Sequence, residues 1–151
     1  MAQQLILHPT DGSSAARKAL EFAVDLARGR QARLLILHVQ RSHGSYAVPD
    51  AFKDFERVEH LHLSEQEVLA GVAVQIAEEA EAAARALGLA EVESLVIEGD
   101  PAQRILETAE TRKADLIVMG SRGLGDLQGM LLGSVSHKVA HLAPCTCVLV
   151  R

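Results

Sequence analysis

Short apolar runs alternate with longer amphipathic stretches along this chain. The apolar runs are nearly continuous, which is typical of parallel strands that are covered on both faces. They predict five strands, at Leu5–Pro9, Arg33–Val39, Val92–Gly99, Asp115–Gly120 and Cys145–Arg151. The amphipathic stretches predict four helices between them, at Ser13–Arg28, Ser64–Leu87, Asp100–Lys113 and Ser134–Leu142.

Residues that favour helix ends mark several of these boundaries. Ser64 and Glu67 have the spacing of a capping box, and Asp100 followed by Pro101 is a typical helix start. Gly29 is the expected stop of the first helix. These local signals agree with the hydrophobic pattern, so we expect helices and strands to alternate regularly.

The alternating order predicts an α/β fold with a parallel sheet. The 151 residues are enough for one domain, which we expect to span 1–151. With right-handed crossovers, the five strands are expected to form an open sheet in the order 3-2-1-4-5, with helices on both faces. The segment 40–63 carries no clear pattern beyond a short helical turn, and it is long for a loop in a compact domain.

Composition narrows the class of protein further. Hydrophobic residues make up 48% and aromatic residues 3% of the chain, so we expect an aliphatic core. The net charge of −5 argues against nonspecific nucleic-acid binding. No apolar run is long enough for a membrane span, and the first residues do not read as a signal peptide. Two cysteines in one strand provide no disulfide framework, so we expect a cytoplasmic protein.

Two loops are expected to meet where the strand order reverses, between the first and fourth strands. They are Pro9–Ser14 and the glycine-rich Met119–Ser134, and each leads into a helix. Ligands of such sheets bind beyond the carboxyl ends of the strands at this reversal, and helix N-termini favour anions. The pattern therefore predicts a nucleotide site, in which Arg122 supplies a cation and Asp11 accepts hydrogen bonds from a ribose. The alternative is that the glycines only allow a tight connection between the fourth strand and the helix that follows it.

The spacing of the glycines excludes two common phosphate loops. A Walker A loop is absent, because no glycine of the loop is followed by lysine. "GLGDLQG" misses the dinucleotide fingerprint by one residue in its last spacing, and it follows the fourth strand instead of the first.

The pattern that fits is G-x2-G-x9-G-[ST], formed by Gly120, Gly123, Gly133 and Ser134. With "DGS" after the first strand, "LLILHV", "ADLIVMGSRG" and "PCTCVLV", the chain resembles the universal stress protein family, in its ATP-binding subclass. The resemblance spans nearly the whole chain and is weakest across 40–63. It implies a Rossmann-like fold of the adenine nucleotide alpha hydrolase-like type.

The resemblance also implies a set of ligand contacts. The family's ATP, often accompanied by Mg²⁺ or Mn²⁺, would be held at the ends of the first two strands, in the glycine loop and at the start of the last helix. These positions are Pro9, Thr10, Asp11, Val39, Met119, Gly120, Arg122, Gly123, Gly133, Ser134, Val135 and Ser136. One departure is visible at "LHPTDGS", because His8 stands where many members carry small or β-branched residues.

The resemblance further implies a homodimer formed through the fifth strand. The apolar run Cys145–Val150 carries no charge, and an exposed edge of this kind needs cover.

No catalytic arrangement can be identified, so we expect an ATP-binding regulatory module that acts through a partner protein. A slow ATPase or autophosphorylating enzyme and a nucleotide-free dimeric interaction protein are the alternatives. His137 and His141 have a metal-ligand spacing but no third ligand, so no metal site is predicted.

Overall fold

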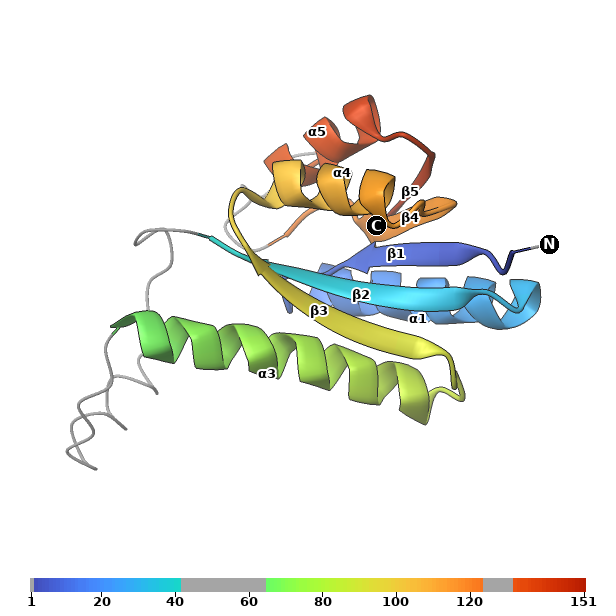
Figure 1. The fold of residues 1–151 in the computed structure, drawn as a ribbon, viewed down its shortest axis with the longest axis horizontal. Coiled ribbons are helices and arrows are strands. Elements are labelled where there is room, and N and C mark those ends of the chain that lie inside the picture. The colour runs from blue at the N-terminus through green and yellow to red at the C-terminus, as the bar shows by residue number, and fades with distance from the viewer. Residues whose placement is uncertain (1, 42–64, 124–131) are drawn as a thin grey trace.

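The computed structural model describes residues 2–41, 65–123 and 132–151, and Figure 1 shows their arrangement. Ser64 and nearly all of the segment 40–63 lie outside the described residues, as do Gly125 and Gly129 of the glycine loop. The predicted order of strands and helices is confirmed. The elements are β1 Leu5–Pro9, α1 Ser14–Arg30, β2 Arg33–Gln40, α3 Glu65–Ala86, β3 Val92–Glu98, α4 Pro101–Thr111, β4 Leu116–Gly120, α5 Ser134–Leu142 and β5 Thr146–Val150.

The strands form one parallel sheet in the order β3-β2-β1-β4-β5, as predicted. β1 pairs with β2 along its whole length, from Leu5 to Pro9. With β4 it pairs only through Ile6↔Leu116 and Leu7↔Ile117. The strand order therefore reverses at a short ladder between β1 and β4, and both strands continue past it toward the carboxyl edge of the sheet.

Two layers of side chains hold the helices on the sheet. Leu5 and Leu7 of β1 pack on the side of α4 and α5, whereas Ile6 packs on the side of α1. Figure 1 shows the same division, with α1 and α3 on one face and α4 and α5 on the other. The buried hydrophobic residues that the structure describes are aliphatic apart from Met119, which confirms the expected kind of core.

The end of α1 differs from the prediction. Gly29 lies inside the helix, and the left-handed residue is Gln31, with φ of 53°. The N–H of Ala32 donates to the carbonyl of Ala27 at 2.8 Å, and Ala32 is buried. The helix thus ends where the chain can close this bond and bury Ala32, and these tertiary contacts override the preference of glycine for a helix end.

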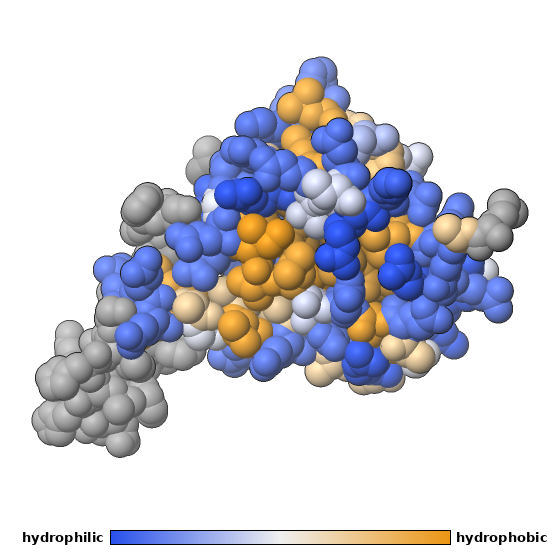
Figure 2. All heavy atoms as spheres, viewed as in Figure 1, coloured by the Kyte–Doolittle hydropathy of each residue, from blue (hydrophilic) through white to orange (hydrophobic). Residues whose placement is uncertain are grey.

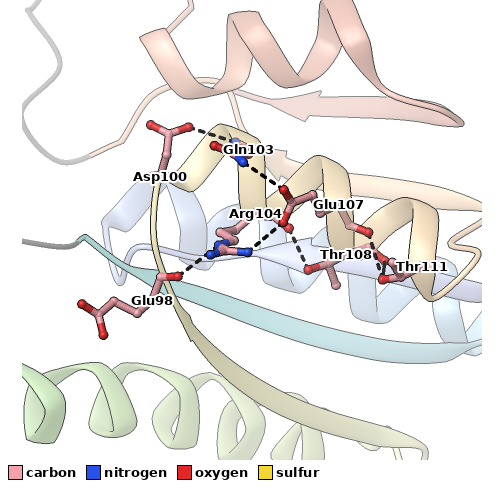
Figure 3. A network of polar contacts seen from close by, with 7 residues as sticks. All are labelled: Glu98, Asp100, Gln103, Arg104, Glu107, Thr108 and Thr111. Atoms are coloured by element: carbon pink, nitrogen blue, oxygen red, sulfur yellow. Dashed lines mark hydrogen bonds and ion pairs between the residues drawn. The ribbon is translucent and has the colours of Figure 1, made fainter.

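The start of α4 follows the prediction, and its first turns are tied to β3 (Figure 3). Asp100 caps the helix by accepting the N–H of Gln103 at 3.0 Å. The Arg104 side chain reaches back toward the strand, where Nε donates to the carbonyl of Glu98 at 3.1 Å, while Nη1 pairs with Glu107 at 2.9 Å. The bond from Arg104 to Glu98 ties α4 to the end of β3, and the other two stabilise the start of the helix itself.

The two edge strands remain partly exposed. Figure 2 shows apolar atoms gathered between α3 and α4, over the region of β2 and β3. Leu95 and Ile97 of β3 are half-buried, and so are the side chains of β5 beyond Thr146. Among the helices of the described residues, none is long and apolar enough to cross a membrane.

The N-cap of α1 allows a matched test of this fold. Ser13 Oγ accepts the N–H of Ala16 at 3.1 Å, whereas Ser14 is an exposed residue of the first helical turn. Ser13→Ala should lower the free energy of unfolding by about 1 kcal/mol, and Ser14→Ala should change it by less than about 0.5 kcal/mol. Urea denaturation measures both, and equal effects of the two changes would contradict the assigned cap.

Candidate functional site

The β1–α1 turn forms the first half of the site. The N–H of Gly12 donates to Thr10 Oγ1 at 3.2 Å, and the N–H of Ser13 donates to Asp11 Oδ1 at 2.9 Å. Gly12 has φ of +78°, and a Cβ there would lie 3.3 Å from Ile76 of α3. Glycine is therefore favoured here, because other residues rarely adopt this left-handed backbone and a Cβ would press on the Ile76 side chain.

The end of β4 forms the second half. A Cβ on Gly120 would lie 3.1 Å from the Arg122 carbonyl oxygen and 3.2 Å from the carbonyl carbon of Ala15. The missing side chain at this position thus lets β4 pass directly over the first turn of α1. We predicted a glycine here for the approach of a ligand, and the packing against Ala15 is a separate requirement that the sequence pattern did not reveal.

The described ends of the glycine loop are tied together by a group of hydrogen bonds. The Ser121 carbonyl accepts the N–H of Gly133 at 2.7 Å and the Ser136 hydroxyl at 2.6 Å. The N–H of Ser121 in turn donates to the carbonyl of Val150 in β5 at 2.8 Å. Ser136 is buried, so its hydroxyl hydrogen serves the fold, and its backbone N–H is the donor it can offer a ligand.

The N-terminus of α5 starts directly from this closure. Gly133 is the N-cap, in extended backbone, and it makes no side-chain cap bond. Ser134 and Ser136 lie inside the first turn of the helix. The first amides of a helix have no acceptor within the helix, and the helix dipole places partial positive charge there. This end of α5 is therefore chemically suited to an anion.

The other predicted positions lie at neighbouring strand ends. Val39 ends the apolar part of β2, Pro9 ends β1 and Met119 precedes Gly120 in β4; all three are buried. Arg122 is exposed, and Thr10 and Asp11 are half-buried. The carboxyl ends of the three adjacent central strands β2, β1 and β4 thus carry the predicted residues on one edge of the sheet, which is where the strand order reverses.

A histidine pair, His8 and His38, lies beneath this edge, and we did not predict its role. His8 of β1 is fully buried, with Nδ1 2.8 Å from the Val118 carbonyl oxygen. His38 of β2 is 3% exposed, with Nδ1 2.8 Å from the Thr10 carbonyl oxygen. Because a carbonyl only accepts, Nδ1 must carry the proton in both rings. In the sequence, the signal for this pair was a histidine near the end of each of two apolar runs, Leu5–Pro9 and Arg33–Val39.

Burial changes the protonation of both rings. It lowers the pKa of His8 to about 4, although the bond to Val118 and the charge of Asp11 act in the opposite direction. Burial also lowers the pKa of His38. Nε2 of His8 has no hydrogen-bond partner among the described residues. A proton placed there would be buried without an acceptor, so the neutral ring is the form that the fold tolerates.

The remaining candidates show no sign of a metal centre. Cys145 and Cys147 are free and half-buried, and burial raises the pKa of Cys147 to about 11. His137 and His141 are exposed on α5. Within the part of the chain that the structure describes, no three His, Cys, Asp or Glu side chains come together as metal ligands.

The buried neutral His8 should make the fold sensitive to acid. The unfolded chain takes up a proton at this residue near the ordinary histidine pKa of 6.5, whereas the folded chain does so only near pH 4. The contribution of neutral His8 to the free energy of unfolding is thus complete above about pH 6.5 and is lost as the pH drops toward 4. At pH 4.5 the loss due to this residue should be about 2.5 kcal/mol.

His8→Val should remove this part of the acid loss. Urea unfolding at pH 7 and pH 4.5 measures it, and the drop between the two should be about 2.5 kcal/mol smaller in the variant. The control His141→Gln changes an exposed histidine and should keep the wild-type drop. An equal drop in wild type and His8→Val would refute the assignment.

Comparison with known proteins identifies the family. The model of the universal stress protein family matches residues 4–151. The universal stress protein YxiE of Bacillus subtilis is 39% identical over 149 aligned residues, which cover 93% of this chain and 94% of that protein. Among solved structures, the universal stress protein UspA from Lactobacillus plantarum superposes with a TM-score of 0.77 at 25% identity, covering all of both chains. A universal stress protein in complex with cAMP superposes with a TM-score of 0.71 at 30% identity, covering 100% of this chain and 99% of that one. The chain belongs to the universal stress protein family.

Proposed function

We propose that the chain binds ATP at the carboxyl ends of β1 and β4 and serves as a nucleotide-dependent regulatory module of the stress response. The observation that carries this proposal is the meeting of three features at one edge of the sheet. These are the glycine-dependent β1–α1 turn, the end of β4 and the α5 N-terminus, which has no side-chain cap. Helix N-termini at such a strand reversal are suited to phosphate.

The ligand would lie across the strand ends, with its phosphates toward α5. Gly133 and the amides of Ser134–Ser136 would bind phosphate oxygens, with Gly120, Gly123 and the exposed Arg122 beside them. The adenosine would then lie over the ends of β1, β2 and β4, where the proposed contacts are Pro9, Thr10, Asp11, Val39 and Met119. The related structure in complex with cAMP supports an adenine nucleotide as the class of ligand.

A divalent ion, Mg²⁺ or Mn²⁺, belongs to the proposal as a companion of the triphosphate. The described residues bring together no cluster of three metal-ligating side chains, so the phosphate oxygens would supply much of its coordination.

Binding explains these residues better than rapid hydrolysis does. Asp11 lies in the turn that follows β1, and one of its carboxylate oxygens already accepts the N–H of Ser13 there. We therefore propose that ATP occupancy acts as a signal to a partner protein in the cytoplasm. Slow hydrolysis or autophosphorylation is the enzymatic alternative.

We further propose that β5 is the dimer interface. It is an edge strand of the sheet, and its side chains from Cys147 to Val150 are half-buried in the single chain. Pairing with β5 of a second copy would cover these apolar side chains and the free backbone edge.

A matched pair of glycine substitutions tests the nucleotide site. Gly133 is buried at the α5 N-terminus, so Gly133→Val places a branched side chain beside the amides that would bind phosphate. Gly29 has no atom within 4 Å of an added Cβ and lies at the opposite end of α1. By calorimetry, Gly133→Val should weaken ATP binding at least about tenfold, or 1.4 kcal/mol, and Gly29→Val should leave it unchanged.

Failure of the wild type to bind ATP at millimolar concentration would refute the proposed function. Single-turnover assays with labelled ATP address the enzymatic alternative, since ADP release at ordinary kinase rates would establish turnover as the main activity.

The dimer proposal predicts a mass. Sedimentation equilibrium should give about twice the 16.2 kDa of one chain at micromolar concentration. The Val150 carbonyl faces β4, where it accepts the N–H of Ser121, so the neighbouring Leu149 directs its backbone N–H to the outer edge. Leu149→Pro removes that N–H and should shift the mass toward one chain. A wild type that sediments as a single chain at tens of micromolar would contradict this interface.

A further inference from the structure

The carbonyl of Thr10 is held by a side chain from the neighbouring strand. His38 of β2 donates from Nδ1 to this oxygen at 2.8 Å, and the Thr10 N–H donates to the carbonyl of Leu37 at 2.8 Å. Two successive residues of β2, Leu37 and His38, therefore hold the backbone N–H and the backbone carbonyl of Thr10. Thr10 is the first residue after β1, so this support acts at the start of the β1–α1 turn.

The turn beyond Thr10 is built on the position of that residue. Thr10 Oγ1 accepts the N–H of Gly12, and Asp11 Oδ1 accepts the N–H of Ser13, which then caps α1. A shift of the Thr10 peptide would move Asp11 and the first turn of α1 together. The bond from His38 is thus placed to control the direction of the Thr10 and Asp11 side chains.

The bond also accounts for a polar ring at a position suited to an aliphatic side chain. His38 lies two residues after Ile36, on the sheet face that α1 and α3 cover, and it is 3% exposed. Burying an imidazole is unfavourable unless a hydrogen bond compensates for the lost water. His8 repeats the arrangement one strand away, with its bond to Val118, one residue before Met119.

We propose that His38 is a positioning residue of the nucleotide site, which sets the β1–α1 turn for the adenosine part of the ligand through its bond to Thr10. This inference rests on the proposed ATP site. His38 would not contact the nucleotide. It would act through Thr10 and Asp11, so its loss should weaken ATP and AMP alike, since both carry adenosine.

The test uses calorimetry with ATP and AMP on the full chain. His38→Val removes the donor and keeps an apolar side chain of suitable shape, and it should weaken both nucleotides about tenfold. His38→Asn places an amide N–H near the position of Nδ1 and should restore both affinities to within about threefold of the wild type. The control Thr108→Val removes a hydroxyl bond of 2.7 Å to the Arg104 carbonyl in α4, away from the site, and should leave both affinities unchanged.

The outcomes separate this inference from the proposed function. A wild type that binds neither nucleotide overturns the proposed function and this inference with it. A wild type that binds, with a folded His38→Val of equal affinity, overturns this inference alone. If His38→Val does not fold, as circular dichroism would show, His38→Gln takes its place, because its amide lies one bond too far out to reach Thr10. Asn should then bind better than Gln, and equal affinities would overturn the role of His38.

Discussion

The short parallel ladder between β1 and β4 is the constraint on which the rest of the structure depends. Only Ile6 and Leu7 of β1 are paired with β4, and beyond them the chain leaves β1 for one face of the sheet and β4 for the other. The two connections thus diverge from neighbouring strand ends. Every residue proposed to contact the nucleotide follows from this divergence, because it lies at one of these ends, at the adjacent end of β2, or at the helix that follows.

Close backbone packing brings the two connections together again above the ladder. Gly120 lets β4 cross the first turn of α1, and Gly12 lets the β1–α1 turn approach α3. Ser121 links the base of the glycine loop to both α5 and β5. The hydrogen bonds of Ser121 thus join the base of the loop to the strand that we propose as the dimer interface.

The fold was predictable because each strand and helix has its own hydrophobic pattern in the sequence, and these patterns alternate along the chain. Continuous apolar runs identified parallel strands, and with right-handed crossovers such a chain commonly takes the order 3-2-1-4-5, which the structure confirms. The stop at Gly29 was wrong because the burial of Ala32 determines where α1 ends. Residue positions at the strand ends were also predictable. What could not be predicted is which of them serve the fold, as the hydroxyl of Ser136 does by donating to Ser121.

The histidine pair marks the limit of sequence reasoning most clearly. Each ring lies in an apolar run, and its hydrogen-bond acceptor belongs to another strand or its end: Val118 for His8 and Thr10 for His38. No spacing within the sequence connects these partners, since the sheet alone brings them within 2.8 Å.

The central claim is that an adenine nucleotide binds across the ends of β1 and β4, and mapping backbone amide shifts by NMR during an ATP titration tests it most directly. The account predicts shifts concentrated at Thr10–Gly12, Gly120–Gly123 and Ser134–Ser136, with little change at the opposite edge of the sheet around Gln31 and Lys113. A spectrum that does not change, or shifts centred on that opposite edge, would contradict the account.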